Sequence, residues 1–172
     1  MVPADGEVGV SDRELYEGFA LQAVDDKGRV AIPADLRVTF DRNSVERVLM
    51  VGKHSLDPCL IAHDIAWSQA NGMRIAERNE RALDEGRVDA VDPRAGRNLH
   101  GRLDRAKLDS SNRVILSPYH LDRVKIGDWA FFLGVGNQFE IWAPEVLVKT
   151  DTVDDEIRDI CRFYCQQKGV AL

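Results

Sequence analysis

A short polar turn occurs twice in this chain, and the spacing between its two copies constrains the fold more than any other feature. The segments DDKGR, residues 25–29, and DSSNR, residues 109–113, each begin with aspartate and end with arginine, and they lie 84 residues apart. A short apolar run and then a proline follow each copy. Solenoid repeats are about 20–50 residues long, so this longer period indicates that a small domain has been duplicated.

The order of predicted secondary structure repeats along with the turn. Pro33 and Pro118 each favour the start of a short helix after a short strand. Asp64 is a suitable N-cap for a longer helix that extends to about Leu83. Eight segments have the composition of short strands: 19–24, 30–32, 46–52, 58–63, 99–108, 114–116, 129–134 and 138–142.

These elements predict an α+β fold that is mainly β, built from two tandem modules with a helix after each. Each module has about four short strands and too few apolar residues to bury a good core alone, so we expect the two to share one core. The predicted divisions are a flexible N-terminal extension over 1–16, a first module over 17–63, a helix and connection over 64–98, a second module over 99–143 and a C-terminal helix over 144–172.

The charge distribution limits the partners that the chain can have. Its net charge of −6 argues against nonspecific, charge-driven binding to nucleic acid. Residues 94–113 nevertheless hold six basic and two acidic side chains, whereas residues 140–159 hold two basic and seven acidic ones. The basic segment is either a solvated surface or a DNA-facing one, and Arg105 and Lys107 are its candidate DNA contacts.

Three further features of the sequence favour a cytoplasmic protein. No stretch approaches the roughly 20 apolar residues that span a bilayer. The acidic N-terminus lacks the apolar segment of a secretory signal. The three cysteines, Cys59, Cys161 and Cys165, are an odd count and do not resemble a disulfide framework.

The residue types in the repeated turn fix its shape. Asp25 and Asp109 can accept hydrogen bonds from the backbone N–H groups that follow them, as in an Asx turn. The fourth position is Gly28 in one copy and Asn112 in the other. Glycine and asparagine tolerate positive φ best, so both turns are expected to need a left-handed residue there.

Each turn ends in an arginine, Arg29 or Arg113, at the start of a strand. A guanidinium that projects from a rigid turn is suited to bidentate contact with a phosphate or with the edge of a guanine. The alternative is that each arginine pairs with its neighbouring aspartate and only closes the turn. Two copies at matching positions favour a turn that aims a side chain, because the same direction is then required twice.

The two turns, with Val30 and Val114 after them, resemble the paired DxxxR signatures of MraZ proteins, which are bacterial transcriptional regulators of the tandem SpoVT/AbrB type. The segment FLGVGNQFEIW, residues 132–142, resembles the end of that family's second domain. The resemblance covers about residues 16–147. It implies two AbrB-like swapped-hairpin modules that form a pseudo-dimer within one chain, and chains that assemble into a ring.

The resemblance also implies a function. Such a protein binds direct repeats in the promoter of the division and cell-wall gene cluster and represses it, so its partners are double-stranded DNA and further copies of itself, at the nucleoid. Arg29 and Arg113 become the DNA-contacting arginines, and Lys27 assists in the first turn. A ring that presents several weak sites gains about 10²–10⁴ in affinity through effective concentration.

Three positions depart from the family pattern. Asn112 stands where glycine is usual, which keeps the backbone shape but adds bulk near the DNA. Ser111 stands where the first turn has Lys27, so the two modules are not expected to bind equally. Glu17 stands where many members have a basic residue, which weakens the attraction of this edge for DNA.

Other functions find less support in the sequence. An antitoxin-like AbrB module that only binds proteins would carry a long disordered tail, whereas the C-terminal segment is predicted to be helical. No catalytic constellation surrounds His120, so we expect no enzyme activity and no cofactor or small-molecule substrate. His54, Cys59 and His63 offer three ligands and no fourth, so no structural metal site is expected.

Overall fold

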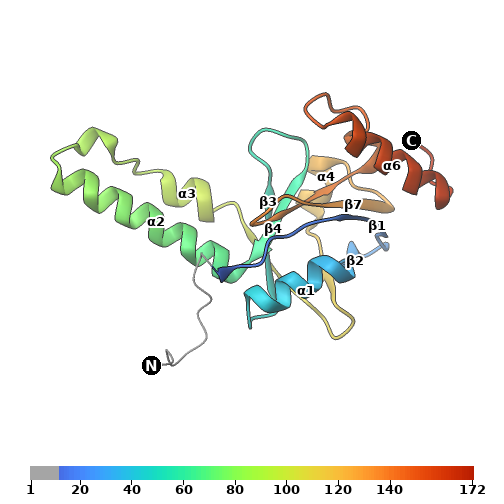
Figure 1. Ribbon diagram of the computed structural model, residues 1–172, viewed down its shortest axis with the longest axis horizontal. Coiled ribbons are helices and arrows are strands. Elements are labelled where there is room, and N and C mark those ends of the chain that lie inside the picture. Colours follow the sequence, from blue (N-terminus) through green and yellow to red (C-terminus); the bar gives the residue numbers. More distant parts are fainter. Residues whose placement is uncertain (1–11) are drawn as a thin grey trace.

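The computed structural model describes residues 12–172 and shows an α+β protein (Figure 1). Within this range the chain forms eight strands, six α-helices and one short 3₁₀ helix, η2. The expected α+β class is confirmed. The helices hold more residues than the strands, so the expected predominance of β structure is wrong. The twenty-residue helix after the fourth strand accounts for much of this difference.

Six strands form one antiparallel sheet, and the remaining two form a separate ribbon. The order in the large sheet is β1 (Phe19–Ala23), β7 (Trp129–Gly134), β8 (Phe139–Trp142), β4 (Leu60–Asp64), β3 (Val48–Lys53) and β5 (Asp104–Lys107). The ribbon pairs β2 (Arg29–Ala31) with β6 (Arg113–Ile115). Seven of the eight predicted strands lie within two residues of an observed strand at each end.

Both halves of the chain contribute strands to the large sheet, and each half also supplies an edge strand that pairs with the other half. β1 from the first half pairs with β7 from the second, with Phe19 opposite Leu133. β5 from the second half pairs with β3 from the first, with Lys107 opposite Val48. The ribbon likewise contains one strand from each half. The hairpins β3–β4 and β7–β8 pair within one half, whereas β1, β5 and both strands of the ribbon depend on the other half for a partner.

The hydrophobic core is shared in the same way. Its largest cluster combines side chains such as Leu36 and Phe40 from the first half with Leu116, Phe132 and Ile141 from the second, each at most 1% exposed. Burial of one such side chain contributes about 1.5–3 kcal/mol. The expectation of one shared core is confirmed.

The helices surround this sheet or extend from it. They are α1 (Ala34–Asn43), α2 (Ile65–Asp84), η2 (Val88–Ala90), α3 (Ala95–His100), α4 (Pro118–Val124), α5 (Pro144–Leu147) and α6 (Asp155–Gln167). Asp64 caps α2 as predicted, because its carboxylate accepts the Trp67 backbone N–H at 2.9 Å. In Figure 1, α2 projects away from the sheet, and α3 lies along α2 where the chain returns toward the sheet.

Two predicted elements differ from the structure. Of the strand predicted over 99–108, only β5 forms, because the residues up to His100 belong to α3. This helix packs along α2, where Gly72 leaves room for the imidazole ring of His100. The single helix predicted over 144–172 is two helices, α5 and α6. The Asp154 side chain accepts the Glu156 N–H at 2.9 Å and so begins a new helix after α5 has ended.

The predicted N-terminal extension contains a buried ion pair. Residues 1–11 lie outside the described residues, but Arg13 Nη1 donates to Asp64 Oδ1 at 2.9 Å and Tyr16 Oη donates to Asp64 Oδ2 at 2.7 Å. All three side chains are buried. Burial by itself raises the pKa of Asp64, but the hydrogen bonds and charge of Arg13 and the Tyr16 hydroxyl bring it below its usual value. This cluster ties the start of the described chain to the N-terminus of α2.

Candidate nucleic-acid interface

The first turn is held by one aspartate. Asp25 Oδ1 accepts the backbone N–H groups of Lys27 at 3.0 Å and Arg29 at 2.9 Å. The Asp25 carbonyl accepts the N–H of Gly28 at 3.0 Å, and the Asp25 N–H donates to the Arg29 carbonyl at 3.0 Å. Gly28 has a φ of 75°, the left-handed conformation that the sequence favours there.

The second turn repeats this network atom for atom. Asp109 Oδ1 accepts the N–H groups of Ser111 at 2.8 Å and Arg113 at 3.0 Å. The Asp109 carbonyl accepts the N–H of Asn112 at 3.0 Å, and Asn112 has a φ of 58°. Asparagine is one of the few residues other than glycine that adopt this conformation readily. The duplicated sequence therefore produces duplicated geometry.

Both turn carboxylates are stabilised in their charged form. The backbone N–H of Arg29 lowers the pKa of Asp25 below its usual value, with further help from the Arg29 side chain. The backbone N–H of Arg113 lowers the pKa of Asp109 in the same way, and the N–H of Ser111 contributes. A carboxylate that accepts several N–H groups stays ionised, so at neutral pH both turns keep these bonds.

The carboxylates also orient the arginines. Arg29 Nε lies 2.6 Å from Asp25 Oδ2, and Arg113 Nε lies 2.9 Å from Asp109 Oδ2. Among residues 12–172, the terminal nitrogens of these two arginines make no hydrogen bond. The two side chains are 33% and 40% exposed. Pairing with aspartate thus holds one edge of each guanidinium and leaves the other edge available to a ligand.

The ribbon brings the two arginines onto one face. Arg29 pairs with Ile115, and Arg113 pairs with Ala31, so the two arginines are diagonal neighbours across the antiparallel pair. Such neighbours are about 7–8 Å apart. Val30 and its partner Val114 point the other way and are buried. The outer face of the ribbon therefore presents two guanidiniums that come from opposite halves of the chain.

Each turn is fastened to the opposite half. The Leu116 N–H donates to the Gly28 carbonyl at 2.9 Å, and the Ile32 N–H donates to the Asn112 carbonyl at 3.0 Å. Leu116 and Ile32 are both buried in the shared core. The position of each turn is consequently set by a backbone bond to the other module as well as by its own aspartate.

The remaining predicted contacts lie near this face to different degrees. Lys27 is exposed within the first turn. Arg105 and Lys107 lie on the outward side of β5, an edge strand, and Lys107 is two residues before the second turn. Arg105 Nη2 is also 4.0 Å from Glu46 Oε2. The structure joins Arg29 to Arg113 through the ribbon, whereas it places Arg105 on the neighbouring sheet.

Arg47 also belongs to this region, although the sequence pattern does not predict it. Arg47, just before β3, donates from Nη2 to Asn112 Oδ1 at 2.5 Å. It lies 65 positions from its partner, and its own sequence surroundings, SVERVLM, have no turn signature. Only the pairing of the two halves brings it to the second turn.

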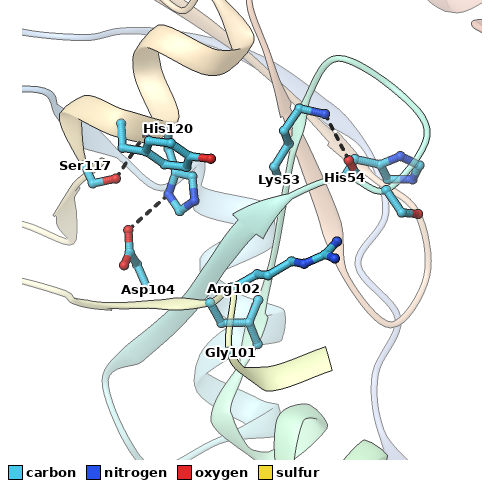
Figure 2. A pocket seen from close by; sticks show the side chains of 10 residues that line it. Lys53, His54, Gly101, Arg102, Asp104, Ser117 and His120 are labelled. Atoms are coloured by element: carbon cyan, nitrogen blue, oxygen red, sulfur yellow. Dashed lines mark hydrogen bonds and ion pairs between the residues drawn. The ribbon is translucent and has the colours of Figure 1, made fainter. Parts of the chain in front are cut away.

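The structure also has a cavity of about 660 Å³ away from the turns, between the end of β3 and α4 (Figure 2). His120 is buried beside it, and its Nδ1 is 3.1 Å from Asp104 Oδ2. The Ser117 hydroxyl accepts the His120 backbone N–H at 3.3 Å and so caps α4. Figure 2 shows Lys53 and Arg102 on the opposite side of the cavity. Ser117 therefore stabilises the N-terminus of α4.

Two general findings concern residues 12–172. In this part of the chain, no three or more His, Cys, Asp and Glu side chains are grouped so that they could hold a metal ion. Within the same part, every helix is too short or too polar to cross a membrane.

Comparison with known proteins gives the class of this chain. No protein-family model matches it. It is 31% identical over 134 residues to the transcriptional regulator MraZ of Saccharophagus degradans, an alignment that covers 76% of this chain and 84% of that protein. It is 27% identical over 152 residues to MraZ of Xylella fastidiosa, covering 84% and 95% of the two chains, and 26% identical over 159 residues to MraZ of Coxiella burnetii, covering 85% and 99%.

These relatives are named regulators of transcription, and their family is not one of enzymes. The fold, with two arginine turns on one face, suits that class. The chain belongs to the MraZ family of transcriptional regulators.

Proposed function

We propose that this protein represses transcription by binding short direct repeats in promoter DNA, with Arg29 and Arg113 as its principal DNA contacts. The promoter is that of the division and cell-wall gene cluster, which the family resemblance implies. The observation that carries the proposal is the pair of guanidiniums on the outer face of the ribbon, each with its terminal nitrogens unbonded among the described residues. Two such groups can make charge-assisted bonds to phosphate or bidentate bonds to guanine.

The interleaved strands support a swapped-hairpin pseudo-dimer as the architecture behind this site. Its modules are residues 17–63 and 99–143, with a helix and connection over 64–98 and helices over 144–172. The pairing of β2 with β6, and the exchange of β1 and β5 between the halves, are what such a pseudo-dimer requires. In this arrangement one chain offers two related contacts to one duplex.

Assembly into a ring completes the proposal. One chain has about two to four cationic contacts at its turns, and its net charge is −6, so a single chain binds DNA weakly and with strong salt dependence. Several chains in a ring would meet successive repeats, and effective concentration then raises the affinity by about 10²–10⁴. Occupation of the promoter by the ring excludes RNA polymerase.

The test compares single arginine variants with a matched control. Arg29→Ala and Arg113→Ala each weaken binding to the promoter fragment by about 1–3 kcal/mol while the fold remains intact. Arg87→Ala serves as the control, because Arg87 is also half-exposed and ion-paired, with Glu85, but lies beyond α2 and far along the chain from both turns. Gel-shift affinity is measured for all three, and circular dichroism checks the fold. Unchanged affinity in both turn variants contradicts the proposed contact surface.

A further inference from the structure

Arg47 belongs to the first half of the chain but lies against the second turn. Its Nη2 donates to Asn112 Oδ1 at 2.5 Å, and its Nη1 donates to Asp41 Oδ1 at 3.4 Å. Its backbone carbonyl accepts the N–H of Leu108, the residue before Asp109, at 3.0 Å. Backbone and side chain both bind this region, so the guanidinium is held beside the turn and does not reach it by chance.

The corresponding place beside the first turn has the opposite charge. The N–H of Val24, the residue before Asp25, donates to the carbonyl of Asp128 at 2.8 Å, as that of Leu108 does to Arg47. Asp128 precedes β7 just as Arg47 precedes β3. Pseudo-symmetry therefore places an aspartate at one turn and an arginine at the other.

The two turns also differ at their third position, where the first turn has a cation and the second does not. The first turn contains Lys27, and the second has Ser111 at the matching position. The first turn thus has one internal cation, Lys27, next to an internal anion, Asp26, and it has an acidic neighbour. The second turn has serines at both matching positions and a basic neighbour. With Arg47 counted, each turn has one cation beside its principal arginine.

We propose that Arg47 is a further DNA-binding residue, which contacts a backbone phosphate at the second turn in the role that Lys27 has at the first. The inference rests on the proposed function, because it assumes that the turn face meets a duplex. It also gives Asn112 a purpose: its amide oxygen, which glycine would lack, anchors the guanidinium at the turn.

The contacts of Arg47 leave it able to bind a phosphate. Its side chain is 42% exposed. A guanidinium has five N–H donors, and the acceptor on Asn112 is neutral, so that bond does not compensate the positive charge. The bond to Asp41 is long, at 3.4 Å, and that carboxylate is 46% exposed. A phosphate, which accepts shorter and charge-assisted bonds, is the stronger partner for the same group.

The test measures the salt dependence of DNA binding, which counts phosphate contacts. The probe is a duplex that the wild-type protein selects from a random pool. Arg47→Gln, which removes the charge, lowers the slope of log affinity against log salt by about one and weakens binding to all sequences similarly. Arg47→Lys keeps the wild-type slope. Ser111→Lys added to Arg47→Gln restores the slope, because it places a cation where the first turn has Lys27.

The outcomes distinguish a failure of the inference about Arg47 from a failure of the proposed function. If no duplex is selected, or if Arg29→Ala and Arg113→Ala both bind the selected duplex as well as wild type, the proposed function is wrong. If Arg113→Ala alone binds as well as wild type, the second turn makes no DNA contact and the inference about Arg47 is wrong. If Arg113→Ala weakens binding but Arg47→Gln leaves the slope unchanged, Arg47 is no phosphate contact and the inference alone is wrong. A loss of affinity in Arg47→Gln without a change of slope would mean that Arg47 only holds the turn in shape. Thermal unfolding of each variant verifies that it is folded.

Discussion

The two Asp–Arg turns have one backbone geometry and two different surroundings. At the first, a Cβ on Gly28 would lie 2.9 Å from the Leu116 carbonyl oxygen and 3.1 Å from Leu121 Cδ1, so no side chain fits. At the second, the side chain of Asn112 extends to Arg47 on the exposed surface. The left-handed backbone is required at both places, but glycine is required only where the opposite module packs against the turn. Duplication preserved the shape of the turn and let its chemistry diverge.

The substitution with the largest expected effect on stability disrupts only the first turn. Gly28→Ala combines a left-handed alanine with a contact of 2.9 Å to backbone, and we expect it to lower the free energy of unfolding by about 2–4 kcal/mol. Asn112→Gly is the matched control. It keeps the backbone conformation, and we expect a change within about 1 kcal/mol. Urea unfolding measures both. Equal effects from the two substitutions would show that the turns have the same packing.

A smaller effect is expected from a substitution that makes the charge of the first turn resemble that of the second. Lys27→Ser removes the internal cation, and we expect the salt slope of DNA binding to fall by about one while base preference is retained. Ser111→Lys makes the reverse change, and we expect it to raise the slope by the same amount. Fluorescence anisotropy at several salt concentrations measures these slopes. If neither substitution changes the slope, position three of the turns does not face the phosphates.

The smallest effect concerns the carboxylates, and here the two turns should agree. The pKa values of Asp25 and Asp109 are lowered in the folded state, chiefly by the backbone N–H groups that they accept. A carboxylate whose pKa is lower in the folded state stabilises the fold at pH values above its unfolded-state pKa of roughly 3.9. This stabilisation is lost as the pH falls through the folded-state pKa. Asp25→Asn and Asp109→Asn are therefore less stable than wild type at pH 7, and the difference narrows toward pH 3. A difference that does not vary with pH would contradict this origin.

The repeated turn and the strand pattern made much of the fold predictable. Local signals were sufficient for the strand that leads into Asp25, for the cap at Asp64 and for the left-handed residues at 28 and 112, because each depends on neighbours within a few positions. The short apolar strands of both modules also implied a shared core. Local patterns work where the deciding interaction is itself local.

The errors occur where distant partners decide. The sequence pattern predicts a strand at Leu99 and His100, but packing against α2 makes them helical. Arg13 lies in the predicted extension, but it is buried and pairs with Asp64, 51 positions later. No local signal in the sequence points to Arg47, since its partner Asn112 belongs to the other module. Tertiary context overrides local preference in each of these cases.

The most direct test of DNA binding through Arg29 and Arg113 is a footprint on the DNA upstream of this protein's own gene, taken at two salt concentrations. We expect the wild-type protein to protect a set of short direct repeats and this protection to weaken at the higher salt concentration. The double variant Arg29→Ala, Arg113→Ala should lose the protection while remaining folded. Protection by the double variant equal to that of wild type would contradict the account, because the DNA would then be held by a different face of the molecule.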